Sequence, residues 1–155
     1  MPLPAASFPC CRAHDLFAPL DEYAEALRRG PGDEAYWLHW KSSFDGSATI
    51  RVARLGDEAM FFRVYRSSPF GKVRRGRGWV SMPDWARFED ALIAASFWML
   101  DEYGGGHGLD GADWYIAGRR RSEYHRISRW SPGGALWDLG RIFFDLAGLE
   151  DVRLG

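Results

Sequence analysis

The feature that most constrains the fold of this sequence is a group of three closely spaced β-type segments between residues 36 and 65. Apolar residues recur there with a period of two or in short continuous runs, at 36–40, 49–53 and 60–65. Asp45-Gly46 and Gly56-Asp57 separate the segments, and both pairs are typical of tight hairpin turns. A fourth strand is expected around 78–81. The pattern therefore predicts a four-stranded meander.

Three other segments have the three- and four-residue apolar spacing of amphipathic helices. The first, 16–27, precedes Gly30-Pro31, a pair that ends helices. The second begins at Pro83 and extends to about Leu100, with an apolar stripe formed by Trp85, Phe88, Leu92, Ala95 and Met99. The third lies near the C-terminus, with apolar positions at Leu136, Leu139, Ile142, Phe143, Leu146 and Leu149.

A second hairpin is predicted between the last two helices, with strands at 114–117 and 124–128. The order of elements indicates an α+β fold with a mostly antiparallel sheet. We expect the four-stranded meander plus this hairpin to be packed by the central amphipathic helix, with further helices at the N- and C-terminal ends. Residues 1–14 are expected to be a flexible leader, followed by a single α+β domain at 15–155.

The composition excludes two broad classes of protein. A chain of 155 residues with 46% hydrophobic residues can bury a core, which excludes disorder as the main state. A net charge of -1 excludes a uniformly basic nucleic-acid coat. Cys10 and Cys11 are adjacent, so a bridge between them would need a strained ring. With no signal-peptide pattern and no long apolar run, we expect a cytoplasmic protein without a membrane segment.

Neither a cofactor nor a metal ion is expected. The G-x-G-x-x-G string at 106–111 follows a predicted helix and precedes a predicted strand, whereas a dinucleotide site needs the reverse order. The four histidines, at positions 14, 39, 107 and 125, have no helical i, i+4 spacing, and the chain has no Cys-x-x-Cys to join them.

The near-zero net charge conceals separate basic and acidic stretches. Residues 51–77 hold eight basic and two acidic side chains, whereas residues 78–118 hold one basic and seven acidic. The candidate partner-binding residues therefore form two sets. The acidic set is Asp84, Glu89, Asp90, Asp101, Glu102, Asp110 and Asp113. The basic set is Arg74, Arg75, Arg77, Arg119, Arg120 and Arg121.

The arginine-rich stretches leave three interpretations open. With the neighbouring aromatic residues they can form a nucleic-acid surface, in which arginines neutralise phosphates and rings stack on bases. They can also bind an acidic protein partner. Both stretches fall at predicted turns, where solvated charge without a partner is common.

His125 is the candidate for catalysis, together with Glu123. His125 lies in a predicted strand beside Glu123 and Arg126, residue types that perform acid-base catalysis and phosphate stabilisation in a metal-independent ribonuclease. Polar residues that alternate along a half-buried hairpin are also expected for structural reasons alone.

The chain is tryptophan-rich, with eight tryptophans spread over the predicted elements. One core of this size seldom needs so many. Exposed tryptophans flanked by arginine are typical of protein-protein hot spots, so some of the eight are candidates for an interface. Core packing alone is the alternative.

The C-terminal third resembles a segment that recurs in small uncharacterised bacterial proteins. The resembling residues are Phe97-Trp98, Leu109-Asp110-Gly111, Trp114, Gly118, Tyr124-His125, Arg129-Trp130-Ser131-Pro132 and 145–149. Small α+β proteins of this kind resemble immunity proteins encoded beside secreted antibacterial toxins. The resemblance implies a cytoplasmic protein that binds one toxin domain and blocks its active site. The alternatives are a metal-independent nuclease or hydrolase that uses His125, and a nucleic-acid-binding module that uses the arginine-rich hairpins.

Overall fold

The computed structural model describes residues 33–106 and 108–154. Within them, four strands come first, two helices follow, and three further strands precede a final helix. In chain order these elements are β1 (Glu34–Ser42), β2 (Ser47–Leu55), β3 (Glu58–Arg66), β4 (Val73–Val80), α2 (Met82–Ala94), the 3-10 helix η3 (Phe97–Met99), β5 (Tyr103–Gly104), β6 (Ala112–Arg120), β7 (Glu123–Trp130) and α3 (Gly134–Leu146).

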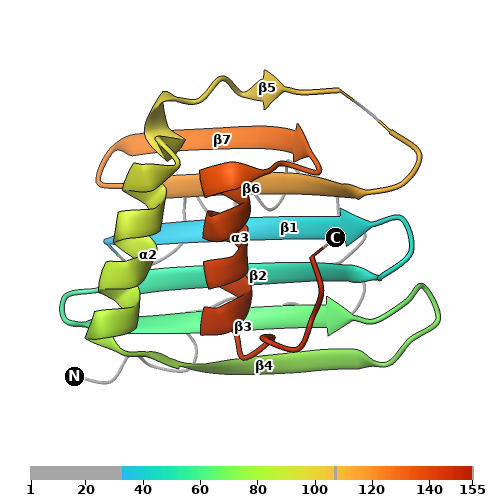
Figure 1. Cartoon of the computed structure of the whole chain (residues 1–155). Coiled ribbons are helices and arrows are strands. Elements are labelled where there is room, and N and C mark those ends of the chain that lie inside the picture. The colour runs from blue at the N-terminus through green and yellow to red at the C-terminus, as the bar shows by residue number, and fades with distance from the viewer. Residues whose placement is uncertain (1–32, 107, 155) are drawn as a thin grey trace.

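The strands form one seven-stranded mixed sheet in the order β4-β3-β2-β1-β6-β7-β5 (Figure 1). β1 to β4 pair as antiparallel neighbours, and β6 and β7 form a second antiparallel pair. β6 joins the two groups because it also pairs antiparallel with β1. The two-residue strand β5 pairs in parallel with β7, which makes the sheet mixed.

The predicted architecture is therefore wrong. Instead of a four-stranded meander with an additional hairpin, the chain forms a single seven-stranded mixed sheet, and two helices pack on it. The pairing of β6 with β1 runs from Glu34↔Arg120 to Ser42↔Ala112, which places β1 at the centre of the sheet. Apolar periodicity predicts strands but carries no information on which distant strands pair, so this long-range contact was missed.

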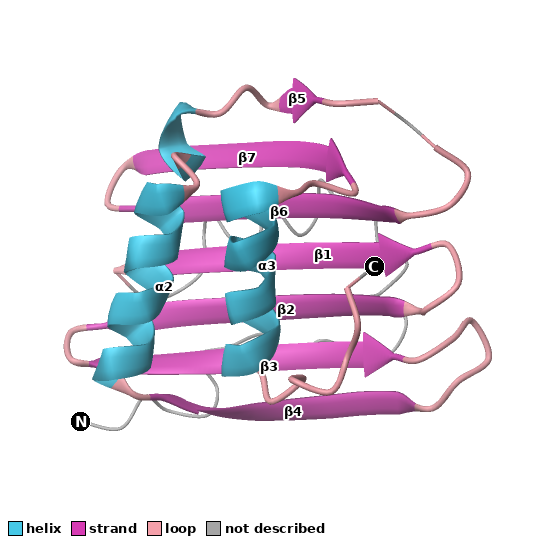
Figure 2. Ribbon diagram, viewed as in Figure 1, coloured by secondary structure: helices cyan, strands magenta, loops and turns pink. Residues whose placement is uncertain are grey.

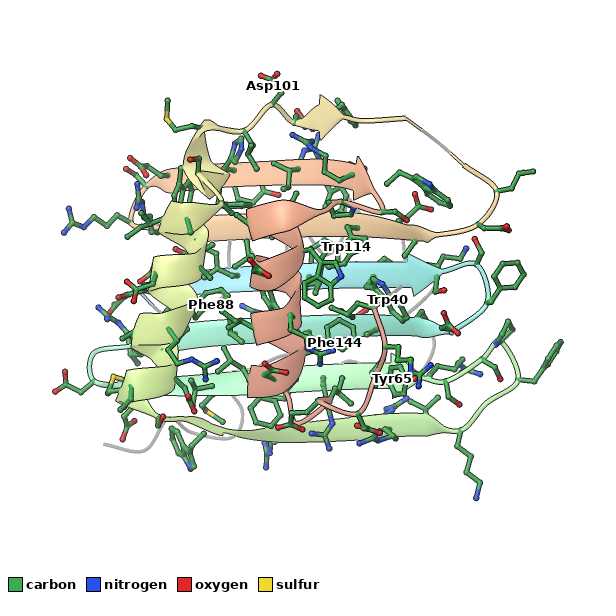
Figure 3. All side chains as sticks on the ribbon, viewed as in Figure 1. Trp40, Tyr65, Phe88, Asp101, Trp114 and Phe144 are labelled. Carbon is green, nitrogen blue, oxygen red and sulfur yellow. The ribbon has the colours of Figure 1, made fainter. Side chains whose placement is uncertain are left out.

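Helices α2 and α3 lie side by side on one face of the sheet (Figure 2). Figure 3 shows Trp40, Trp114 and Phe144 where α3 meets the sheet, and the rings of Trp40 and Phe144 make an edge-to-face contact with centroids 5.5 Å apart. Phe88 of α2 makes a similar contact with Phe143 of α3, at 4.9 Å. Aromatic packing thus forms the core between the sheet and the two helices.

The predicted central helix ends earlier than its apolar pattern suggested. α2 stops at Ala94, because Ser96 adopts the left-handed conformation with φ 50°. The following 3-10 helix buries Phe97 completely but leaves Met99 85% exposed, although Met99 was assigned to the apolar stripe. The apolar pattern alone does not predict the change of backbone direction at Ser96, after which the side chains point to different faces.

The two predicted terminal helices have different outcomes. α3 confirms the C-terminal helix and buries Leu139 and Phe143. The predicted helix at 16–27 and the predicted leader at 1–14 lie outside the described residues. Within 33–106 and 108–154, no helix is long and apolar enough to span a membrane.

The face of the sheet opposite α2 and α3 also carries buried side chains. They form a second apolar cluster of Ala35, Trp37, Ala53, Met60, Phe62 and Ala117. Side chains of a strand alternate between faces, so a strand buried on both faces is apolar at nearly every position. This is why the sequence of β1 is a nearly continuous apolar run.

Candidate functional site

Three loops meet at the end of the sheet where β1 stops and β2 begins. They are the turn 43–46, the loop 67–72 and the segment that leads into β6. The backbone N–H of Ser43 donates to the Gly111 carbonyl at 2.9 Å, and its hydroxyl donates to the Leu109 carbonyl at 3.1 Å. Gly46 packs so closely on the start of the second loop that a Cβ there would lie 1.8 Å from the Arg66 carbonyl oxygen. The two hydrogen bonds join the turn 43–46 to the segment before β6, and the close approach at Gly46 places the start of the loop 67–72 against the same turn.

Each loop exposes one large apolar side chain. Phe44 is 71% exposed, Phe70 99% and Leu109 92%. Exposed carboxylates accompany them at Asp45, Asp110 and Asp113. These six residues form what we call the loop-end surface. Binding residues are commonly carried by loops on a rigid sheet, and grouped exposed apolar side chains commonly mark interaction sites.

Sequence reasoning identified Asp110 and Asp113 but missed the three apolar residues of the loop-end surface. The missed signal is their position beside turn-forming residues. Phe44 precedes Asp45-Gly46, and Phe70 lies between Pro69 and Gly71. A bulky apolar residue in such a turn has no strand or helix neighbours to bury it, so its exposure could have been inferred.

The first basic stretch was expected at a turn, but Arg74, Arg75 and Arg77 lie on β4, at one edge of the sheet. The prediction was wrong because arginines and glycines at 74–78 lack the apolar alternation that predicts a strand. Arg75 and Arg77 are exposed, whereas Arg74 forms an ion pair with Asp151 at 3.2 Å. Trp79, near the end of the strand, is 56% exposed. β4 therefore presents a basic edge with one aromatic side chain beside it.

A charged hollow of about 630 Å³ lies at the end of the sheet opposite the loop-end surface. It brings together Glu89 of the acidic set, Arg120 and Arg121 of the basic set, and the catalytic candidate Glu123. The rest of its lining is Asp33, Glu34, Arg54 and Ser122.

Neighbouring groups already engage most of the charged side chains of this hollow. Glu89 accepts a hydrogen bond from the Trp85 indole at 2.8 Å and faces Arg54 at 3.5 Å. Arg120 binds Glu123 at 2.8 Å, an interaction that raises the pKa of Arg120, and lies 4.4 Å from the centre of the Trp98 ring. These contacts are typical of a structural ion-pair network at the end of a sheet.

A buried hydroxyl also contributes to this network. The Tyr36 hydroxyl donates to the Glu34 carboxylate. Burial of the ring, followed by this hydrogen bond, raises the pKa of Tyr36 well above its usual range. Tyr36 is therefore a neutral hydrogen-bond donor at physiological pH.

His125 packs among aromatic rings. Its ring centroid lies 5.3 Å from that of Phe97 and 6.3 Å from that of Trp98. Its Nε2 is buried and has no hydrogen-bond partner among the described residues. Glu123, its proposed catalytic companion, is instead bound to Arg120. Within the described part of the chain, no three His, Cys, Asp or Glu side chains group closely enough to hold a metal ion.

The remaining acidic candidates do not form one surface. Asp84 pairs with Arg87 at 3.3 Å on α2, and the same helix carries the exposed Asp90. Glu102 pairs with Arg126 at 2.5 Å near β5. The exposed Asp101 lies in that same region (Figure 3).

The basic candidates are also divided. β3, β2 and β1 lie between the β4 arginines and β6, which carries the half-buried Arg119 and ends at Arg120. With strands about 4.8 Å apart, β4 and β6 are separated by about 19 Å across the sheet. The two arginine-rich stretches therefore do not merge into one compact patch.

Most of the tryptophans belong to the core. Trp40, Trp85 and Trp114 are fully buried, and Trp37 is 2% exposed. All eight tryptophans lie within the described residues, and Trp79 alone is classed as exposed. Core packing thus accounts for most of the unusual tryptophan content, and Trp79 is the residue left for an interface.

Comparison with known proteins gives no functional information, so the functional proposal rests on the geometry described above. No protein-family model matches the chain, and no curated protein matches it.

Proposed function

We propose that the protein is a cytoplasmic immunity-type protein that binds a secreted toxin domain and occludes its active site. The observation that carries this proposal is the loop-end surface, where Phe44, Phe70 and Leu109 are exposed on three connected loops. Apolar side chains held in this way anchor protein interfaces, because burying them in a partner removes a large apolar area from water.

The charges around these anchors define the kind of partner. The exposed Asp45 and Asp110 directly follow Phe44 and Leu109 in the sequence, and the exposed Asp113 faces Lys41 across the β1–β6 pair. A toxin that acts on nucleic acid presents a basic surface, to which such an acidic rim is complementary. The partner expected at this surface has apolar pockets bordered by lysine or arginine.

Co-expression with the product of the adjacent gene tests the proposal. The wild-type chain is expected to co-purify with that product and to protect cells from it. A variant with Phe44→Ser, Phe70→Ser and Leu109→Ser is expected to lose both properties while keeping its melting temperature, because substitutions of exposed residues change stability by only about 0.5 kcal/mol each.

Ile93→Ser is the matched control, because Ile93 is 76% exposed but lies on α2, outside the loop-end surface. It should retain co-purification and protection. A monomeric wild-type chain that neither binds the adjacent product nor protects cells would overturn the proposal. If the triple variant and Ile93→Ser lose co-purification and protection equally, the loop-end surface is not the binding site.

The alternative is a metal-independent nuclease or hydrolase that uses His125. The observation favouring it is the buried Nε2 of His125, which has no hydrogen-bond partner in the described part of the chain. A folded His125→Ala variant distinguishes the two functions, because an immunity-type protein should keep its protective activity and an enzyme should lose its activity.

A further inference from the structure

β4 is an edge strand of the sheet that the described residues form. It is eight residues long and stands first in the strand order, with β3 as its neighbour. Among residues 33–106 and 108–154, no strand pairs with its outer side. An open edge presents backbone N–H and C=O groups that can bind another extended chain.

The hydrogen-bond pattern of the sheet identifies which β4 residues face outward. The Ser42 N–H donates to the Gly46 carbonyl, so even-numbered residues of β1 and β2 bond to each other. Bonding alternates along antiparallel strands, so odd-numbered residues of β2 bond to β3, and Gly76 and Gly78 of β4 bond back to β3. The outward N–H and C=O groups belong to Val73, Arg75, Arg77 and Trp79.

The side chains of these four residues share one face of the sheet, because they alternate with Val80, which packs into the core beneath the helices. Along this face the order is a half-buried valine, two exposed arginines and an exposed tryptophan. Arg74 projects to the helix face and is held by Asp151. The outer edge therefore combines open backbone groups with two cationic side chains and two apolar ones.

We infer that the β4 edge binds an extended acidic segment of another protein by strand addition. The segment would place carboxylates beside Arg75 and Arg77 and apolar side chains beside Val73 and Trp79. The order apolar, acidic, acidic, apolar at alternate positions reads the same in both directions, so it suits a parallel or an antiparallel segment. Main-chain hydrogen bonds would supply affinity, and the alternate side chains would supply specificity.

Two other occupants fit this edge less well. A second copy of β4 would bring arginines of both chains alongside each other, and like charges on adjacent strands are destabilising. A nucleic acid can neutralise the arginines, but its phosphates only accept hydrogen bonds and would leave the outward β4 carbonyls without donors. A peptide backbone offers both donors and acceptors.

A synthetic peptide, Val-Thr-Glu-Thr-Glu-Thr-Val, is the probe for this inference, used with the full chain and followed by NMR. We expect saturable shifts on β4 at peptide concentrations up to about 1 mM. Amide hydrogen exchange should slow at Val73, Arg75, Arg77 and Trp79. Gly76 and Gly78, which already bond to β3, should be unaffected.

Paired variants separate charge from backbone pairing. Reversing both charges, with Arg75→Glu and Arg77→Glu, should weaken binding of this peptide about tenfold, and a peptide with lysine in place of glutamate should then bind instead. Arg77→Pro removes one outward N–H without breaking a bond to β3, and it should bind more weakly than Arg77→Ala, which keeps that N–H.

Several results would overturn the inference. The first is no saturable binding of the acidic peptide to the wild-type chain. The second is equal binding of the acidic and lysine peptides to the wild-type chain. The third is a single-stranded oligonucleotide that displaces the peptide and binds β4 more tightly. The charge-swap pair decides the question even if Arg77→Pro fails to fold. The probe is a free peptide, so a negative peptide result does not bear on the loop-end surface or on the immunity-type function. A negative result for that function likewise does not bear on peptide binding at β4.

Discussion

At Gly140, α3 packs directly on the sheet. A Cβ at this position would lie 1.8 Å from the ring of Trp114, which is itself 1% exposed and fixed in the core. Glycine is therefore required by space, because a buried indole ring cannot move away without disturbing its neighbours. The close approach allows α3 to bury Leu139, Phe143 and Phe144 against the strands.

Gly140→Ala is expected to lower the free energy of unfolding by about 1–3 kcal/mol through overpacking. Urea denaturation followed by tryptophan fluorescence measures this change. Gly106→Ala is the matched control, because a Cβ at Gly106 meets nothing within 4 Å. If both variants retain wild-type stability, α3 does not pack on Trp114 as described.

His39 makes stability depend on pH. Its Nδ1 lies 3.0 Å from the Thr49 hydroxyl, and its ring stacks on Trp37. Burial, assisted by the charge of Lys41, lowers the pKa of His39 from 6.5 to about 4. The unfolded chain therefore binds a proton at this position in a pH range where the folded chain does not.

The contribution of His39 to stability should be complete above about pH 6.5, fall as the pH is lowered towards 4, and change no further below that value. His39→Gln removes the titrating group, so its free energy of unfolding should change less than that of the wild type across this window. Urea denaturation at a series of pH values measures the difference. If the free energies of unfolding of the two proteins change in parallel with pH, His39 is not the cause of the pH dependence.

At the scale of elements, the start of α2 was predictable and its end was not. Ser81 caps the helix, since its hydroxyl accepts a hydrogen bond from the Asp84 N–H at 3.2 Å, and Pro83 occupies the first turn. Both signals are local and can be read in the sequence. The end depends on the left-handed Ser96 and on Phe97 turning into the core, and both follow from contacts with other elements.

Ser81→Ala should lower the free energy of unfolding by about 1 kcal/mol, because the Asp84 N–H loses its acceptor. Ser81→Asp supplies another capping oxygen and should retain most of the wild-type stability. Thermal and urea unfolding of the three proteins measure the effect. If the alanine variant matches the wild type, the cap does not stabilise α2.

The strands also differ in how far the sequence predicts them. β1, β2 and β3 follow from alternation and from turn residues, which are properties of a few consecutive positions. β5 has only two residues and pairs in parallel with β7, so no pattern of its own predicts it. Of the loop-end surface, the carboxylates Asp110 and Asp113 were identified, but their union with Phe44 and Phe70 depends on three loops meeting in space.

At the scale of the whole molecule, β1 holds the sheet together. It pairs with β2 through a short local turn and with β6 across a long stretch of chain. Its residues Leu38 and Trp40 are fully buried on the helix face, and Trp37 is buried on the other. Loss of β1 would therefore separate the β2–β3–β4 group from β6 and β7.

Amide hydrogen exchange should show this hierarchy in the free protein. The amides of Leu38 and Trp40 are expected to exchange only on global unfolding, because β1 is paired on both sides and buried on both faces. The outward amides of Arg75 and Arg77 should exchange orders of magnitude faster. NMR at several denaturant concentrations measures both rates, and similar protection of β1 and the β4 edge would contradict the strand order.

The sequence by itself determined where β1 to β3, β6, β7 and α3 lie and where α2 begins, because periodicity, caps and turns act over a few neighbouring residues. Of β4 it predicted only the last part, because residues 72–77 lack apolar alternation. The tertiary structure decided that β6 joins β1 in one seven-stranded sheet, that both helices share one face, and that most of the tryptophans are core. It also decided which charged residues lie together, such as Glu89, Arg120 and Glu123 in the charged hollow. These outcomes depend on contacts between residues far apart in the chain, which local patterns do not encode.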